Sequence, residues 1–284
     1  EQKMGIKGSA TCVLNFDAAV GYLVGDINKG LNSMFTMMNL ERIIVGIQGI
    51  GLAETAYQNA LIYALDRKQG RKDRRQPTKD DPADPIIVHP DVRKDILIMK
   101  SLIEGERALA FWLSQNADVM LRHSNSDICE EAADLVALMT PAVKSFFTDV
   151  GVEITNNAMQ VFGGHGYIKE HGMEQLVRDA RITPIYEGTN GIQAIDLATR
   201  KLSMADGGAI LGLLDQFAEN AAAMASGDDR LLKLTGDRLS KAVTALRAAT
   251  EWLLDVRKGN ADALLFGATA YQELFGRVAG VHYL

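Results

Sequence analysis

A proline-free stretch with apolar side chains at helical spacing constrains the fold of this chain more than any other feature. The stretch starts at Leu31 and continues for about forty residues. Its regularly spaced apolar residues are Ile43, Ile47, Ile50, Tyr57 and Leu61. A helix of this length extends on the order of 60 Å and is typical of large helical bundles. We therefore expect long packed helices at the centre of the fold.

Two further long helices are predicted beyond a break in this pattern. Residues 70–85 combine many charges with prolines and are interpreted as an exposed loop. Pro90 is well placed at the first position of a second helix, because a missing amide hydrogen costs nothing there. Ser126 or Asp127 is expected to cap a third helix, within which Pro141 predicts a kink or a restart.

Shorter helices and a different N-terminal segment complete the predicted fold. The later helices are expected at residues 173–180, from Asn190, and at residues 209–226, 229–258 and 260–280. Residues 1–30 combine strand formers with glycines and allow at most two or three strands. The predicted architecture is mostly α: a bundle over residues 31–205, a short β remnant over residues 1–30 before it, and a helical extension over residues 206–284 after it.

Composition and charge limit the possible functions. The chain has 284 residues, of which 47% are hydrophobic and 23% charged, and it is long enough for two compact domains. A net charge of −6 and a pI near 5.4 argue against a general affinity for nucleic acid or anionic membranes. No apolar run reaches the roughly 18 residues that span a bilayer, so no membrane span is predicted.

The metal-binding residue types are sparse. Cys12 and Cys129 are too few for a disulfide framework or a metal knuckle, and they predict reduced thiols in the cytoplasm or an organelle matrix. Long helical bundles often hold two iron ions through Glu-x-x-His motifs, but no such motif occurs in the chain. The sequence therefore predicts no metal site.

One carboxylate stands in an unusual context, between an aromatic residue and a glycine-rich turn. Glu187 follows Tyr186 and precedes Gly-Thr-Asn-Gly at residues 188–191. Thr189 and Asn190 suit the start of a helix, and a nearby Glu gains a few tenths of a kcal/mol from the helix dipole. The residues alone leave a purely structural role and a catalytic role open.

Four segments, in this order along the chain, together resemble acyl-CoA dehydrogenases. They are KMGIKGSAT, NLERIIVGIQGIGLAETAYQNALIYALDRKQGR, QVFGGHGYIKEHGMEQLVRDARI and PIYEGTNGIQ. The resemblance covers residues 1 to about 203, and the last eighty or so residues resemble the extension of a branch that includes 3-methylmercaptopropionyl-CoA dehydrogenases.

The resemblance implies a domain plan. The family has an N-terminal helical domain, a middle β-barrel domain and a C-terminal four-helix bundle. Residues 1–30 would then be the end of the middle domain, and residues 31–205 the four-helix bundle. The chain, which starts at Glu1, is accordingly expected to be the C-terminal half of a longer protein.

The resemblance also implies a reaction, the FAD-dependent α,β-dehydrogenation of an acyl-CoA thioester. Glu187 matches the family's general base, and Gly188 leaves room for the acyl chain. Some branches place the base on the first bundle helix in a Leu-Glu-Arg context, which Glu41 matches. Those branches usually lack the later Glu, whereas this chain keeps both, which favours Glu187. Two ionised carboxylates aimed at one carbon would also repel each other, so Glu41 is expected to turn away into an ion pair.

Residue by residue, the same resemblance implies two sets of contacts. The FAD-binding residues would be Arg67, Gln69, Gln160, Gly163, Gly164, Thr189 and Asn190, and the substrate-binding residues Arg42, Tyr186 and Gly188. The chain departs from the family at Gly70, which follows Gln69 without an aromatic residue, and at Pro90, which replaces a common Gln. His89 is left out of the site, because a His before a Pro is commonly a cap or surface residue.

Partners follow from the resemblance as well. The family implies a homodimer or homotetramer in which each flavin takes contacts from a neighbour, and electron-transfer flavoprotein as the electron acceptor. An acyl-CoA oxidase of the same fold and a flavin-free helical scaffold formed by the isolated piece are the alternatives.

Overall fold

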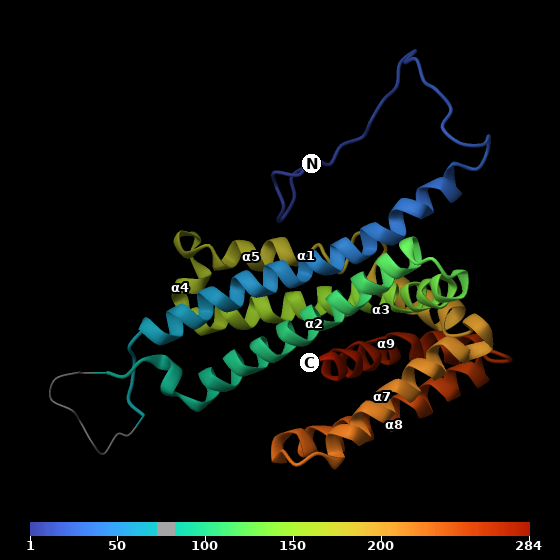
Figure 1. Ribbon diagram of the computed structural model, residues 1–284. Coiled ribbons are helices and arrows are strands. Elements are labelled where there is room, and N and C mark those ends of the chain that lie inside the picture. Colours follow the sequence, from blue (N-terminus) through green and yellow to red (C-terminus); the bar gives the residue numbers. More distant parts are fainter. Residues whose placement is uncertain (73–82) are drawn as a thin grey trace.

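Three long helices form the centre of the computed structural model, which describes residues 1–72 and 83–284. They are α1 (Gly30–Asp66), α2 (Pro90–Arg122) and α3 (Ser126–Phe162), and they lie side by side (Figure 1). The starts predicted near Leu31 and Pro90 are confirmed. Most of the loop predicted at residues 70–85 lies outside the described residues, but its two ends meet in an antiparallel bridge between Lys68 and Pro85.

Shorter helices pack against α3 and lead to a second group of helices. The first set is α4 (Gly164–Tyr167), α5 (Met173–Ala180) and α6 (Asn190–Asp196). The second set is α7 (Gly208–Ser226), α8 (Arg230–Val256) and α9 (Ala261–Tyr283). Short 3₁₀ or π turns occur at Ile86–Val88, Lys169–His171, Leu197–Lys201 and Met204–Gly207. Helices α7 and α8 pair, and α9 lies against α2 and α3 as a fourth long helix of the bundle (Figure 1).

The helix starts show which polar side chains act as caps. Asn125, and not Ser126 or Asp127, caps α3: its side-chain oxygen accepts the amide hydrogen of Asp127 at 2.8 Å. Thr189 caps α6, as its residue type predicts. Helix α3 runs through Pro141 without ending, so the restart allowed for there is wrong. Packing on all sides of α3 outweighs the local preference of proline.

The β remnant predicted for residues 1–30 is also wrong, since residues 1–29 contain no strand. A strand needs a neighbour to take its backbone hydrogen bonds, and no described segment provides one. The first residues dock on α5 instead. The amide of Ile6 donates to the Asp179 carboxylate at 2.6 Å, and the Arg178 guanidinium donates to the Met4 carbonyl at 2.8 Å.

The apolar side chains of α3 fill the centre of the bundle. Among the described residues, one helix, α3, is long and apolar enough to cross a membrane by length and composition alone. However, 72% of its most apolar 18-residue window is buried inside the structure. Its composition is that of a core helix enclosed by protein.

Glycines bring two pairs of helices into backbone contact. A Cβ on Gly49 of α1 would lie 2.5 Å from the Phe147 carbonyl oxygen on α3, and one on Gly151 would lie 2.9 Å from the Gly49 carbonyl oxygen. Between α2 and α9, a Cβ on Gly105 would lie 2.7 Å from the Gly280 carbonyl oxygen. Larger residues would force these helices apart.

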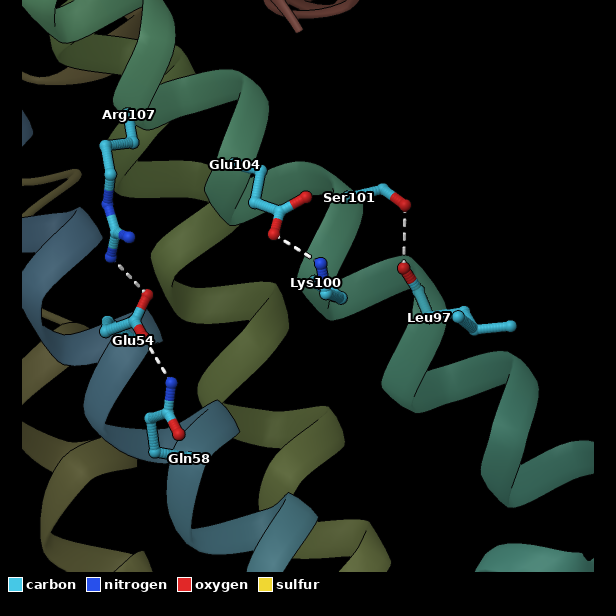
Figure 2. Close-up of polar contacts among 7 residues, drawn as sticks. All are labelled: Glu54, Gln58, Leu97, Lys100, Ser101, Glu104 and Arg107. Atoms are coloured by element: carbon cyan, nitrogen blue, oxygen red, sulfur yellow. Dashed lines mark hydrogen bonds and ion pairs between the residues drawn. The ribbon is translucent and has the colours of Figure 1, made fainter. Parts of the chain in front are cut away.

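Polar contacts on the surface join α1 to α2. The Arg107 guanidinium of α2 pairs with the Glu54 carboxylate of α1 at 2.6 Å, and Gln58 also donates to Glu54, at 2.7 Å (Figure 2). The Lys100–Glu104 ion pair in the same view stays within α2. Exposed ion pairs contribute about 0–1 kcal/mol, so they select the helix pairing less than the core does.

A buried carboxyl group lies on the inner side of α2. The Glu106 side chain is fully buried, and neither of its oxygens has a hydrogen-bond partner among the described residues. Burial raises the pKa of Glu106 well above its usual range, Glu153 raises it further and Arg277 opposes the shift. The group is therefore held in its protonated form well above the pH at which an exposed Glu ionises.

The contact between α1 and α3 predicts opposite effects for two glycines of α1. Gly49→Ala should lower the free energy of unfolding by about 1–3 kcal/mol or more, because the new methyl meets backbone atoms that cannot rotate away. Gly51→Ala, with no atom within 4 Å of its Cβ, should be neutral or stabilising by about 0.5–1 kcal/mol. Urea unfolding of both variants measures the difference, and equal midpoints would contradict the contact.

The buried Glu106 predicts a pH dependence of stability. Because its pKa is raised in the folded state, its stabilising contribution is complete below the unfolded pKa of about 4.3 and is lost as the pH rises through the folded value. In the Glu106→Met variant, the urea concentration at the midpoint of unfolding should decrease less than in the wild type as the pH rises above about 4.3. Glu104→Gln, an exposed neighbour on α2, is the control and should keep the wild-type slope.

Candidate active site

The turn that carries Glu187 has an unusual backbone. Both Glu187 and the following Gly188 have positive φ angles, 56° and 82°. A non-glycine residue in this region costs on the order of 1–3 kcal/mol, and such strain clusters at functional sites. At Gly188 a side chain would also meet the Gln193 side chain, since a Cβ there would lie 2.6 Å from Gln193 Nε2.

Contacts from α6 hold the turn in this conformation. Thr189 accepts the amide hydrogen of Ile192 at 3.3 Å, and the amide of Asn190 donates to the Pro184 carbonyl at 3.0 Å. The Gln193 side chain, which is buried, donates to the Glu187 carbonyl at 3.4 Å. The start of α6 and the strained turn therefore form one unit.

The Asn190 side chain faces α3. It donates to the Asp149 carboxylate at 2.8 Å and to the Thr148 hydroxyl at 3.0 Å, and its oxygen accepts from Lys144 at 2.8 Å. Its donors and its acceptor are thus engaged with the core. We leave Asn190 out of the proposed cofactor contacts, whereas Thr189 is exposed on the outer side of the turn.

Lys144 is a residue of the site that the sequence reasoning missed. Its side chain is fully buried on α3, and its ammonium donates to the Gly188 carbonyl at 2.9 Å. Burial lowers the pKa of Lys144 to about 8; Asp149 and Glu187 oppose this shift and Arg42 adds to it. A lysine inside the apolar run VALMTPAVKSFF was the available signal, because lysine is almost never fully buried without a partner.

The residues predicted to bind substrate gather around this turn. The Tyr186 hydroxyl donates to the Gln48 side chain of α1, another residue that sequence reasoning missed. Burial raises the pKa of Tyr186, the bond to Gln48 opposes the shift, and the charges of Glu187 and Glu41 add to it. The charges of both candidate bases, Glu187 and Glu41, therefore raise the pKa of the same hydroxyl group. Arg42 is half-buried, and its Nε has no hydrogen-bond partner among the described residues.

Four of the predicted FAD-binding residues form a second group at the other end of α1. A groove of about 300 Å³ is lined by Arg67, Gln69, Gly163 and Gly164, beside the Tyr63 and Phe162 rings. These rings stack at 4.1 Å, and the Tyr63 hydroxyl lies 3.0 Å from His165 Nδ1. Gln160 does not line the groove; its carbonyl accepts the Gly163 amide hydrogen at 3.0 Å.

The two groups are far apart within one chain. Arg42 and Arg67 lie on or directly after the same helix, and the residues between them extend on the order of 37 Å along its axis. One molecule therefore does not bring all the predicted residues into a single site. In the described part of the chain, no cluster of three or more His, Cys, Asp or Glu side chains is arranged to hold a metal ion.

Comparison with known families decides where the chain belongs. Residues 28–202 match the family described as "Acyl-CoA dehydrogenase, C-terminal domain". The chain belongs to the acyl-CoA dehydrogenase family. Residues 210–284 match a second description, "Acetyl-CoA dehydrogenase C-terminal like".

The names of similar proteins agree with this family assignment. The chain is 38% identical over 285 aligned positions to the 3-methylmercaptopropionyl-CoA dehydrogenase of Ruegeria pomeroyi, covering 98% of the chain and 47% of that protein. It is 35% identical to the broad-specificity linear acyl-CoA dehydrogenase FadE5 of Mycobacterium tuberculosis, covering 86% of the chain and 40% of that protein. The chain thus spans about half the length of these acyl-CoA dehydrogenases.

Solved structures share the fold. An acyl-CoA dehydrogenase of Bacillus anthracis complexed with FAD superposes with a TM-score of 0.73 at 23% identity, covering 99% of this chain and 47% of the other. ACDH-11 of Caenorhabditis elegans, complexed with C11-CoA, also gives a TM-score of 0.73, at 20% identity, covering 92% and 42%. The chain therefore shares the helical arrangement of these structures.

The strained turn predicts a sensitive position at Gly188. Gly188→Ala should lower the free energy of unfolding by about 1–3 kcal/mol, because alanine disfavours positive φ and its methyl would meet Gln193. Gly212→Ala, within α7 and with no atom near its Cβ, is the matched control and should not destabilise. Thermal unfolding followed by circular dichroism compares the two, and an unaffected Gly188→Ala variant would contradict the strained geometry.

Proposed function

We propose that this chain is the C-terminal half of an FAD-dependent acyl-CoA dehydrogenase, which converts an acyl-CoA thioester into its α,β-unsaturated product. The observation that carries the proposal is the Glu187 carboxylate on a strained, tightly held turn beside Arg42 and Tyr186. Family membership supports the reaction class, and the names of the relatives favour a dehydrogenase over an oxidase.

The N-terminal segment supports the proposal that the chain belongs to a longer protein. Its apolar side chains are exposed, including Val13 at 82%, Phe16 at 78%, Tyr22 at 90% and Val24 at 87%. So many large apolar groups in a row call for burial against another surface. A β domain of the same polypeptide would supply both that surface and the strands that residues 1–29 lack.

Glu187 is the proposed general base. Its carboxylate would take the proton from the carbon next to the thioester carbonyl, while a hydride leaves the adjacent carbon and a double bond forms between the two carbons. Arg42, whose Nε has no partner among the residues that the structure describes, would bind the anionic CoA arm of the substrate.

The residues around the groove fit FAD. A Cβ placed on Gly163 or on Gly164 would have no other atom within 4 Å. The backbone there is therefore open to close approach by a flat or phosphorylated group. The Arg67 guanidinium beside them suits a pyrophosphate. When bound, FAD supplies the flavin ring that accepts the hydride.

The separation of the two groups supports a homo-oligomer. We propose that Arg67, Gln69, Gly163 and Gly164 of one copy complete the FAD site of another, whose Thr189 contacts the flavin, because on the order of 37 Å of α1 separates Arg67 from Arg42. We further expect electron-transfer flavoprotein as the electron acceptor and the cytoplasm or an organelle matrix as the location.

Substitution of the two candidate bases tests the proposed reaction. In the full-length enzyme, Glu187→Gln should lower kcat by about 10²–10⁴-fold, because a positioned base contributes that much, while FAD and acyl-CoA still bind. Glu41→Gln is the matched control and should retain most activity. If Glu187→Gln kept near-normal turnover and Glu41→Gln abolished it, the base would be Glu41.

A further inference from the structure

A single buried cation connects α3 to both sides of the turn that carries Glu187. The Lys144 ammonium donates to the Gly188 carbonyl at 2.9 Å and to the Asn190 side-chain oxygen at 2.8 Å. Gly188 directly follows Glu187, and Asn190 is the first residue of α6. The residue after Glu187 and the first residue of α6 therefore bind the same nitrogen atom, Lys144 Nζ.

Burial of this cation is unfavourable unless its hydrogens are used. The Lys144 side chain is fully buried, and burial lowers its pKa to about 8. Hydrogen bonds from a charged donor are roughly twice as strong as neutral ones. The two bonds to the turn compensate for the loss of water, so their strength depends on the turn keeping its observed shape.

Two other side-chain contacts of the turn are longer. Gln193 donates to the Glu187 carbonyl at 3.4 Å, and the Thr189 cap accepts at 3.3 Å. Positive φ angles at two successive residues persist only where the surroundings impose them. Lys144 provides the shorter, charged bonds to the turn.

We propose that Lys144 is a positioning residue for Glu187. Lys144, on α3, donates hydrogen bonds to the Gly188 carbonyl and to the side-chain oxygen of Asn190. These bonds would fix the position of the Glu187 carboxylate relative to the α-carbon of a bound thioester. This role rests on the function proposed above. Asp149 and Thr148, which bind the same Asn190 side chain, orient its oxygen toward Lys144.

Amide hydrogen exchange tests the hold on the turn in this chain itself. Lys144→Met removes the donors while keeping the apolar stem. The amides of Asn190 and Ile192 should then exchange at least tenfold faster. Thr155→Val is the matched control: Thr155 is fully buried on α3, but its hydroxyl donates only within its own helix, to the Gly151 carbonyl at 2.9 Å and the Val152 carbonyl at 3.0 Å. Unchanged exchange in Lys144→Met would overturn the proposal.

Kinetics of the full-length enzyme test the positioning. Lys144→Met should lower kcat by roughly 10²-fold, the effect of a misplaced catalytic group, with little change in KM for acyl-CoA. Lys144→Arg, which keeps a buried donor, should recover part of kcat, and Thr155→Val should match the wild type. Faster exchange at the turn with an unchanged kcat would overturn the positioning role.

Two further outcomes are distinguishable. If Lys144→Met does not fold, the ammonium signal of the wild-type chain in nitrogen-15 NMR decides. Slowly exchanging protons close to Asn190 would support the proposal, and rapidly averaged protons would overturn it. If the wild-type full-length enzyme dehydrogenates no acyl-CoA, the proposed function fails, while amide exchange still decides whether Lys144 holds the turn.

Discussion

The backbones of α1 and α3 touch at Gly49 and Gly151, and this contact sets the spacing on which the other helices depend. With α1 so close, α3 is enclosed, and side chains along its middle such as Met139, Phe147 and Ile154 are fully buried. Helices α2, α5, α6 and α9 then all pack against α3. The central helix thereby becomes a common reference for segments that are far apart in the sequence.

An enclosed helix can carry polar groups only where they reach another element. Lys144, Thr148 and Asp149 lie on one side of α3, and all three bind Asn190 at the start of α6. From α1, Gln48 binds the Tyr186 hydroxyl just before the turn. The Glu187 turn is thus fixed by two core helices. Hydrogen bonds that involve a charged group contribute about 1.5–3 kcal/mol each to stability, and they offset the backbone strain of the turn.

The long helices could be predicted because their signals are local: apolar spacing, Pro90 at a first position and Thr189 as a cap. The predictions that were wrong concern non-local effects. Strand propensity at residues 1–30 has no pairing partner, and the packing around Pro141 outweighs its local preference. The cap at Asn125 was missed by one residue.

The candidate site shows the same division. The motif residues around Glu187 and around Arg67 could be selected from the sequence, and Arg67, Gln69, Gly163 and Gly164 line one groove in the structure. Lys144 and Gln48 could not be selected, because only the packing of α3 and α1 brings them to the turn. The distance between the two sets along α1 likewise follows from the fold and not from the motifs.

Under the proposed function, the positive φ at Glu187 sets stability against activity at one position. Glycine, asparagine and aspartate tolerate this backbone region far better than glutamate does. Glycine and asparagine remove the charge, and aspartate withdraws it by one methylene, so each relieves the backbone while losing the reach of the carboxylate. A library varied at residue 187 and sorted only for resistance to unfolding would therefore drift toward these three residues. Persistence of glutamate in natural variants of this chain would then measure selection for turnover.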